Sequence, residues 1–291
     1  MTLFTAEALI LHASTGEPLQ FTLHKAYMRW LLTQEVPSRL PADQFSSEGF
    51  LLDALVLHQR MGPGRTCLTA LVQAVDWGIP AINSSKGCGG LMRVAPIGFW
   101  AAMHPEHWPL QRTFQVASSA AQLTHGHACG YLSAGAFAVL LQEIILDTPL
   151  GETLSLLMDM LSGLGETGGE VLHALQQAND LAKKGTSWTD AYNCLGNGWV
   201  AEEILAISVY LGLTAPDFLT GIRCAANHPG DADSVGAISG QLLGAIWGIQ
   251  AIPEDWVERL EGKEAINLLI SQFLSGTKWA SSLNNISRSK G

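Results

Sequence analysis

The sequence predicts an all-α protein, a compact single-domain bundle of many helices. Apolar residues recur at helical spacing along most of the 291 residues, and alternation of β-branched residues is almost absent. The composition is 47 % hydrophobic and only 14 % charged, which is enough apolar material for one large core and favours helices buried on more than one side. We therefore expect a single domain over residues 1–291.

The predicted helices follow one another with short connections that carry proline or glycine. The first, over 2–13, is amphipathic because its apolar side chains are three or four residues apart. The helix over 65–77 follows a glycine-rich turn, and the helix over 199–212 has acidic residues in its first turn, where they favour the helix dipole. The polar residues 281–291 are expected to fray. In chain order the predicted helices are 2–13, 22–33, 50–59, 65–77, 90–103, 109–122, 127–146, 151–163, 168–183, 187–194, 199–212, 214–226, 234–251 and 253–274, with breaks at 36–41, 61–64, 78–89 and 227–230.

Charge and cysteine content exclude several classes of protein. The formal net charge of −10, without a basic stripe, argues against nucleic-acid binding. The five cysteines are widely spaced and form no C-x-x-C pair, which is typical of reduced thiols in the cytoplasm. The first 14 residues lack the basic start and the cleavage site of a signal peptide. The uncharged run 235–252 is long enough for a membrane helix, but polar residues interrupt it and acidic residues flank it. We expect a cytoplasmic protein with no membrane partner.

Asp231, Asp233 and Ser234 form an acid cluster immediately before a long apolar helix. Two carboxylates and a hydroxyl can place three oxygen donors on one hard cation, Mg²⁺ or Mn²⁺. Gly230 permits a tight turn before the cluster, and the N-terminus of the helix offers backbone N–H groups to a phosphate. The alternative is an N-cap, in which the same side chains only satisfy the first N–H groups of the helix.

Glycines recur every fourth residue along that helix, at Gly236, Gly240, Gly244 and Gly248. Each costs up to about 1 kcal/mol relative to alanine in a helix, so four in register predict a bare face against which other backbones pack closely. We expect this helix to be central and buried.

A second candidate site is the glycine-rich stretch from Ser84 to Gly90, which Met92 and Arg93 follow. Backbone N–H groups left open by the glycines, together with the Arg93 guanidinium, would suit a diphosphate. A flexible connector is the alternative. His125 is either a structural histidine or part of the same ligand pocket.

Five motifs, in the right order and spread over most of the chain, resemble the ADP-ribosylglycohydrolase family, which includes the dinitrogenase reductase-activating glycohydrolases and crystallin-like proteins. The C-terminal motif begins at Gly230-Asp-Ala-Asp-Ser-Val and continues into the glycine-rich helix. The other four are Arg65-Thr-Cys-Leu68 after Gly62-Pro-Gly64, Ser84-Ser-Lys-Gly-Cys-Gly-Gly-Leu-Met-Arg-Val-Ala-Pro-Ile-Gly98, Thr124-His-Gly-His127 and Gly196-Asn-Gly-Trp-Val-Ala-Glu-Glu203.

The resemblance implies hydrolysis of the N- or O-glycosidic bond between ADP-ribose and an acceptor, with an ADP-ribosylated protein or a small ADP-ribose-containing ligand as partner. Two Mg²⁺ or Mn²⁺ ions are expected in the full family site, where they position the ribose and activate a water. Asp231 and Asp233 are the implied catalytic residues, and with Ser234 they are the implied metal ligands. The implied substrate-binding residues are Ser85, Gly87, Cys88, Gly89, Gly90, Met92, Arg93 and His125.

The start of the chain departs from the family pattern. Family members open with a G-D-x-x-G segment and a T-D-D-T-Q-M-T-L-type motif, whose Thr-Asp-Asp supplies the other metal ligands, whereas this chain begins Met1-Thr-Leu-Phe-Thr-Ala-Glu7. Met1 matches the internal methionine of that motif, so we expect an N-terminally truncated domain without its first helix and half of its metal ligands. Absent or impaired hydrolysis, and self-association through uncovered apolar surface, are the expected consequences.

The sequence is also compatible with two other functions. One is a non-catalytic ADP-ribose-binding or crystallin-like structural protein that has lost the first half of the metal site. The other, which ignores the resemblance, is a metal-dependent phosphoester hydrolase built on the acid cluster.

Overall fold

A computed structural model of the chain describes residues 1–288, with side chains for residues 1–275. Fourteen α-helices and five short 3-10 helices make up most of this part of the chain, which contains no β-strand. One isolated antiparallel bridge joins Gly87 and Val200. The all-α class predicted from the sequence is confirmed.

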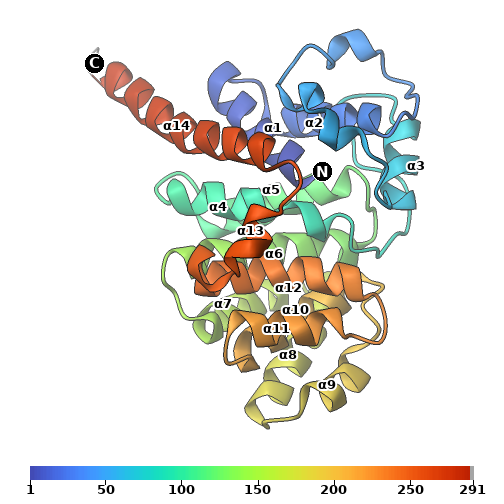
Figure 1. The fold of residues 1–291 in the computed structure, drawn as a ribbon, viewed down its shortest axis with the longest axis vertical. Coiled ribbons are helices and arrows are strands. Elements are labelled where there is room, and N and C mark those ends of the chain that lie inside the picture. Colours follow the sequence, from blue (N-terminus) through green and yellow to red (C-terminus); the bar gives the residue numbers. More distant parts are fainter. Residues whose placement is uncertain (289–291) are drawn as a thin grey trace.

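The helices follow one another in the order shown in Figure 1, where the 3-10 helices are not labelled. The elements are α1 (Thr2–Thr15), α2 (Leu19–Thr33), η1 (Ala42–Gln44), η2 (Leu51–Asp53), η3 (Leu55–His58), α3 (Arg65–Gln73), η4 (Leu91–Arg93), α4 (Ala95–Met103), α5 (Leu110–Gln122), α6 (Ala128–Ile145), α7 (Leu150–Ser162), α8 (Glu166–Lys183), α9 (Trp188–Leu195), α10 (Ala201–Thr214), α11 (Phe218–Ala226), α12 (Ala232–Trp247), η5 (Ile249–Ala251), α13 (Glu254–Glu258) and α14 (Lys263–Arg288).

Helix α6 is central, and it contacts α4, α5, α7, α8, α10 and α12. By length and composition α6 is apolar enough to cross a membrane, yet 72 % of it is buried inside the protein, as in a core helix. Glycines let its neighbours approach closely. A Cβ on Gly98 of α4 would lie 2.5 Å from the Ala138 carbonyl oxygen, and one on Gly135 would lie 2.8 Å from the Phe114 carbonyl oxygen of α5.

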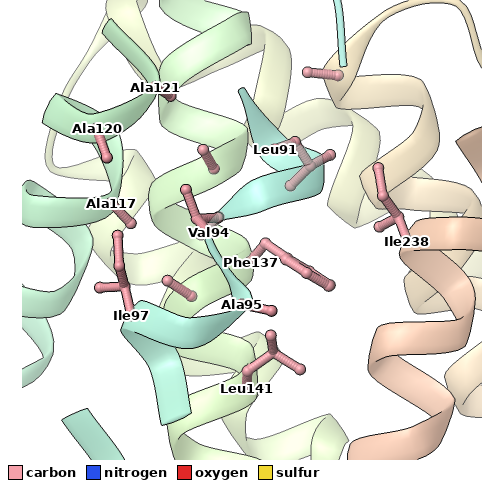
Figure 2. Close-up of a cluster of buried hydrophobic side chains, with 14 of the residues drawn as sticks. Leu91, Val94, Ala95, Ile97, Ala117, Ala120, Ala121, Phe137, Leu141 and Ile238 are labelled. Carbon is pink, nitrogen blue, oxygen red and sulfur yellow. The ribbon is translucent and has the colours of Figure 1, made fainter. Parts of the chain in front are cut away.

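The core beside α6 combines large side chains with alanines (Figure 2). Phe137 of α6 fills the space toward Ile238 of α12, while α5 presents small side chains to the same cluster. Burying one large apolar side chain stabilises the fold by about 1.5–3 kcal/mol, so this cluster fixes how η4 and α4 lie on α6. Its labelled members, each at most 2 % exposed, are Leu91, Val94, Ala95, Ile97, Ala117, Ala120, Ala121, Phe137, Leu141 and Ile238.

A buried ion pair fixes the loop between α2 and α3. Glu7 Oε2 accepts hydrogen bonds from Arg29 Nε at 3.0 Å and Nη2 at 2.8 Å, and both residues are buried. Glu7 Oε1 accepts from the backbone N–H groups of Phe50 at 2.7 Å and Leu51 at 2.9 Å. Gly49 has a φ of +75°, and a Cβ there would overlap the Glu7 carboxylate. The carboxylate is therefore fully satisfied and holds the loop against α1.

Several predicted helices are shorter or divided. Residues 50–59, predicted as one helix, form η2 and η3, and α3 ends at Gln73 rather than at 77. The helix predicted over 253–274 is interrupted, because Gly262 adopts a left-handed φ of +70° between α13 and α14. Helix α14 continues to Arg288, through most of the stretch predicted to fray, and residues 289–291 lie outside the described residues.

The prediction that α12 is covered on its glycine face is wrong. One side of α12 is buried, with Val235 and Leu242 fully enclosed. On the other side, a Cβ added to Gly236 or Gly244 would meet no atom of the described chain within 4 Å, and only Gly240 of these three has a close neighbour. The side chains of the buried face, together with Gly240 next to Ile222 of α11, attach α12 to α10 and α11.

We expect Glu7→Gln to lower the free energy of unfolding by about 3 kcal/mol, because an amide leaves the buried Arg29 charge uncompensated. Chemical denaturation measures this loss. Glu48→Gln is the matched control, since Glu48 contacts the same guanidinium at 3.5 Å but its side chain is 33 % exposed. The control should lose less than about 1 kcal/mol. Equal losses in the two variants would contradict the proposed role of Glu7.

Candidate functional site

Three segments that are distant in sequence meet at one place. The loop of residues 83–90 pairs with the residues before α10 through the Gly87–Val200 bridge and a 2.8 Å hydrogen bond from Ala201 N to the Lys86 carbonyl oxygen. Cys88 Sγ lies 3.5 Å from Ser234 Oγ in the first turn of α12. The fold thus brings the predicted glycine-rich loop and the predicted acid cluster together.

The turn before α12 sets the position of Asp231. The Asp231 backbone N–H donates to the Asn197 carbonyl oxygen at 2.9 Å, and the Gly230 N–H donates to His228 Nδ1 at 3.0 Å. A Cβ on Gly230 would lie 2.0 Å from the Asn197 oxygen, so no other residue fits there. The turn therefore depends on Gly230, as predicted, and on its partners Asn197 and His228.

Asp231 and Asp233 behave as one acidic pair. Burial, and then the neighbouring Asp233, raise the pKa of Asp231, while the hydrogen bond with Asp231 lowers the pKa of Asp233. Asp233 is exposed and Ser234 is buried. Two carboxylates this close repel each other when both are ionised, so a cation between them would be stabilising. Among the described side chains, no third His, Cys, Asp or Glu joins them in a three-ligand cluster.

Arg93 does not face solvent, which corrects its expected contact with a diphosphate. The residue is 1 % exposed, and its Nη2 donates to the Ala120 carbonyl oxygen at 2.7 Å and to Thr124 Oγ1 at 2.8 Å. Its guanidinium also lies 4.2 Å from the ring centroid of Tyr27 and contacts Cys67 Sγ. Arg93 is thus a buried structural cation that joins η4 to α2, α3 and the end of α5.

His125 lies directly beneath the glycine-rich loop. It is 1 % exposed, and its Nδ1 is 2.8 Å from Thr124 Oγ1. A Cβ at Gly87, Gly89 or Gly90 would come within 3.3–3.4 Å of the imidazole. The loop needs glycines in order to lie on this ring. Burial, followed by the charge of Arg93, lowers the pKa of His125 to about 3, so the ring is neutral near pH 7.

The Ser85 end of the loop opens onto a pocket of about 500 Å³. Ser85 Oγ lies 3.1 Å from Thr66 Oγ1 at the start of α3, and both residues line the pocket. Arg39 and Arg65 also line it, and neither makes an ion pair within the described part of the chain. The acid pair and His125 do not line this pocket.

Met92 contributes both its side chain, which packs against the core and contacts Cys88 Sγ, and its backbone to the architecture. Its carbonyl oxygen accepts from Thr2 Oγ1 at 3.2 Å and from Gln241 Nε2 at 3.1 Å. Because Thr2 begins α1 and Gln241 lies in α12, this carbonyl ties both helices to the end of the glycine-rich loop.

The start of α10 makes contacts with the glycine-rich loop and with the turn that precedes the helix. Glu203 caps the turn, as predicted, since its Oε2 accepts from the N–H groups of Asn197 and Gly198. Trp199 is 63 % exposed, immediately before the residue that pairs with the loop. Lys86 pairs with Glu170 and with Glu202, and these carboxylates raise its pKa. Sequence spacing gives no signal for these pairs, because their members come from the loop, α8 and α10.

Comparisons of the sequence with a family model and with individual proteins point to the same family. The ADP-ribosylglycohydrolase family model matches residues 1–282. The chain is 29 % identical to an uncharacterized protein of Archaeoglobus fulgidus, over 74 % of this chain and 67 % of that one. It is 27 % identical to the mouse (Mus musculus) ADP-ribosylhydrolase ARH3, over 64 % of this chain and 56 % of the relative, and 23 % identical to the ADP-ribosyl-[dinitrogen reductase] glycohydrolase of Rhodospirillum rubrum, over 69 % and 60 %.

A solved structure has the same fold. An ADP-ribosylglycohydrolase-related protein complex superposes with a TM-score of 0.60 at 22 % identity, over 94 % of this chain and 81 % of that one. The chain spans less than two thirds of the length of the mouse and Rhodospirillum relatives.

We expect His125→Gln to remove part of the acid sensitivity of the fold. An unfolded histidine has a pKa of about 6.5, and the pKa of His125 is lowered to about 3 in the folded protein. At pH values between these two pKa values, His125 is protonated in the unfolded chain but stays neutral in the folded chain. The stability contributed by neutral His125 is therefore complete above the unfolded pKa and declines as the pH falls toward the folded pKa.

Relative to the variant, the parent should lose about 1.4 kcal/mol of unfolding free energy per pH unit between roughly pH 6 and pH 4. Urea unfolding of both proteins across this range measures the difference. A difference that stays constant with pH would contradict a buried, neutral His125.

Proposed function

The chain belongs to the ADP-ribosylglycohydrolase family, and on that premise we propose that it binds ADP-ribose joined to an acceptor and hydrolyses the glycosidic bond between them. The observation that carries the proposal is the meeting of the Asp231–Asp233 pair with the glycine-rich loop, through the contact of Cys88 with Ser234. An anionic cluster for a cation and a set of open backbone N–H groups are the two features that a phosphorylated sugar requires.

Positive charge in the pocket next to Ser85 supports a diphosphate-binding site there. In a protein with a net charge of −10, an anionic ligand needs local positive groups. Arg39 and Arg65 supply them in the pocket next to Ser85, and the N-terminus of α3 adds backbone N–H groups there. The pocket volume of about 500 Å³ suits a ligand of nucleotide size. We assign the diphosphate recognition first attributed to Arg93 to these residues instead.

The acid pair fits a divalent metal in part. Asp231, Asp233 and Ser234 offer three oxygen ligands, and the mutual repulsion of the two carboxylates favours a hard cation such as Mg²⁺ or Mn²⁺. When bound, such an ion supplies positive charge that orients a ribose hydroxyl and lowers the pKa of a bound water. His228 and Asn197 fix the turn that carries Asp231.

The ligand set of the aspartate pair is small. Because no third acidic, histidine or cysteine ligand completes the Asp231–Asp233 cluster, we propose that the chain binds a single ion weakly and turns over slowly. A non-catalytic ADP-ribose-binding protein is the second candidate, and the same incomplete ligand set favours it.

ADP-ribosylated proteins are the proposed partners. The Rhodospirillum relative is a glycohydrolase of ADP-ribosylated dinitrogen reductase, and another relative, from Pseudomonas putida, is an ADP-ribosylarginine hydrolase. All five cysteines are free thiols in the structure, in keeping with the proposed cytoplasmic location.

We expect Asp231→Ala to weaken Mn²⁺ binding by at least about tenfold, because it removes one of two anionic ligands. Calorimetric titration of the full chain measures this. Asp217→Ala is the matched control, since Asp217 also caps a helix, α11, but stands apart from the cluster. Unchanged Mn²⁺ affinity in Asp231→Ala, with folding intact, would show that the ion binds elsewhere.

We expect the chain to bind free ADP-ribose. In Mn²⁺ it should hydrolyse ADP-ribosylated arginine or serine peptides only slowly. Arg65→Ala should weaken ADP-ribose binding by about tenfold through loss of one charge-assisted contact, as measured by thermal shift in chelator. Gln73→Ala, on the same pocket wall but uncharged, is the control. Slow release that Asp231→Ala abolishes supports the hydrolase, and binding with no release supports the second candidate. Absence of ADP-ribose binding would overturn both.

A further inference from the structure

Three side chains from three helices meet beside Lys86. Cys129 Sγ and one carboxylate oxygen each of Glu170 and Glu202 lie within 4.8 Å of one another. Cys129 is in the first turn of α6, Glu170 in α8 and Glu202 in the first turn of α10. These residues are separate from the Asp231–Asp233 pair and play no part in the proposed hydrolysis.

Glu202 is the carboxylate that its surroundings leave unsatisfied. The residue is 9 % exposed. Its Oε1 accepts from Lys86 Nζ at the long distance of 3.4 Å, and its Oε2 is buried without any partner among the described residues. A buried carboxylate oxygen without a donor costs at least about 1–3 kcal/mol. Such an oxygen beside a buried thiol indicates a site for a cation.

Lys86 neutralises this group incompletely. Its ammonium makes its short contact with Glu170, whose side chain is 58 % exposed, and reaches the buried Glu202 only at 3.4 Å. With the thiol protonated, the two carboxylates and the ammonium leave one negative charge. The buried carboxylate therefore has the weaker share of the Lys86 ammonium.

We propose that Cys129, Glu170 and Glu202 bind a thiophilic divalent cation, for which Zn²⁺ is the best match. One thiolate and two carboxylates suit Zn²⁺, with water in the fourth position, whereas Mg²⁺ takes oxygen ligands. On binding, the sulfur–metal bond forms as the thiol releases its proton to solvent, and the Lys86 ammonium moves away from the carboxylate oxygens. The three anionic ligands are then balanced by the divalent ion together with Lys86.

The geometry requires a small closure. Tetrahedral Zn²⁺, with ligand bonds of about 2.0–2.3 Å, holds its ligand atoms about 3.5 Å apart. The three ligand atoms now lie within 4.8 Å of one another, so they must approach by up to roughly an ångström to bind the ion. Glu170 is exposed and can make that movement. Burial and the two carboxylates raise the pKa of Cys129 to about 12, so one proton should be released for each ion bound near pH 7.

The test uses the full chain, reduced and freed of metal by a chelator, and titrated with Co²⁺. We expect one equivalent to give a thiolate-to-cobalt charge-transfer absorption in the near ultraviolet, which added Zn²⁺ abolishes. Cys129→Ser should remove the absorption, and Glu202→Gln should raise the Zn²⁺ dissociation constant by more than about tenfold. Circular dichroism of each variant establishes that it is folded.

Two cysteine controls locate the sulfur ligand. Cys88→Ser matters most, because Cys88 lies next to Ser234 and could supply sulfur to an ion at the aspartate pair. Cys194→Ser alters an exposed thiol. The absorption should survive both. Its absence in the parent, its persistence in Cys129→Ser, or its loss in Cys88→Ser would overturn the proposal.

Asp231→Ala separates this site from the proposed hydrolase. The cobalt absorption should be unchanged in that variant, even where Mn²⁺ binding and ADP-ribose release are lost. Failure of the hydrolase proposal would leave the absorption intact, and failure of the zinc proposal would leave Mn²⁺ binding at the aspartate pair intact.

Discussion

The buried guanidinium of Arg93 is the interaction on which the site depends. It donates to the end of α5, stacks on Tyr27 of α2 and contacts Cys67 of α3, so four segments share one charge. It also donates to Thr124 Oγ1, which in turn bonds His125. A buried cation of this kind costs several kcal/mol to desolvate and is tolerated only where its partners are fixed. The positions of the partners and of the cation are therefore set together.

This network supports the glycine-rich loop from below. His125 stands on the Arg93–Thr124 pair, and the loop lies on His125 so closely that any side chain at Gly87, Gly89 or Gly90 would press on the ring. The same loop is fastened at its other edge to the start of α10 by the Gly87–Val200 bridge. The loop is thereby held in one conformation, so a ligand that bound to its backbone would cost less ordering entropy.

The two acidic groups beside the loop differ in chemistry. Asp231 and Asp233 offer only oxygen and stand at a helix N-terminus, which suits a hard ion close to a phosphorylated sugar. Glu202 and Glu170 share Lys86 with the loop and lie next to a thiol. Because Lys86 belongs to the loop, a change of cation at Glu202 would alter a contact of the loop itself. Both acidic groups thus lie next to the same loop.

The sequence by itself determined the all-α class, the order of most helices and the residues of the acid motif, because helical periodicity and short motifs are local properties of the chain. It also indicated that Gly230 is required for a tight turn, whereas it left the loop glycines open between a nest and a flexible connector; their packing on His125 decided that they are needed. Local pattern did not determine which face of α12 is covered: four glycines in register are compatible with close packing or with an open face, and the buried side chains Val235 and Leu242 decided it. Nor did it determine that Arg93 is buried, or that Cys129, Glu170 and Glu202 meet. Those outcomes depend on contacts between helices far apart in the chain, where the desolvation of each charge is set by neighbours that no sequence spacing encodes.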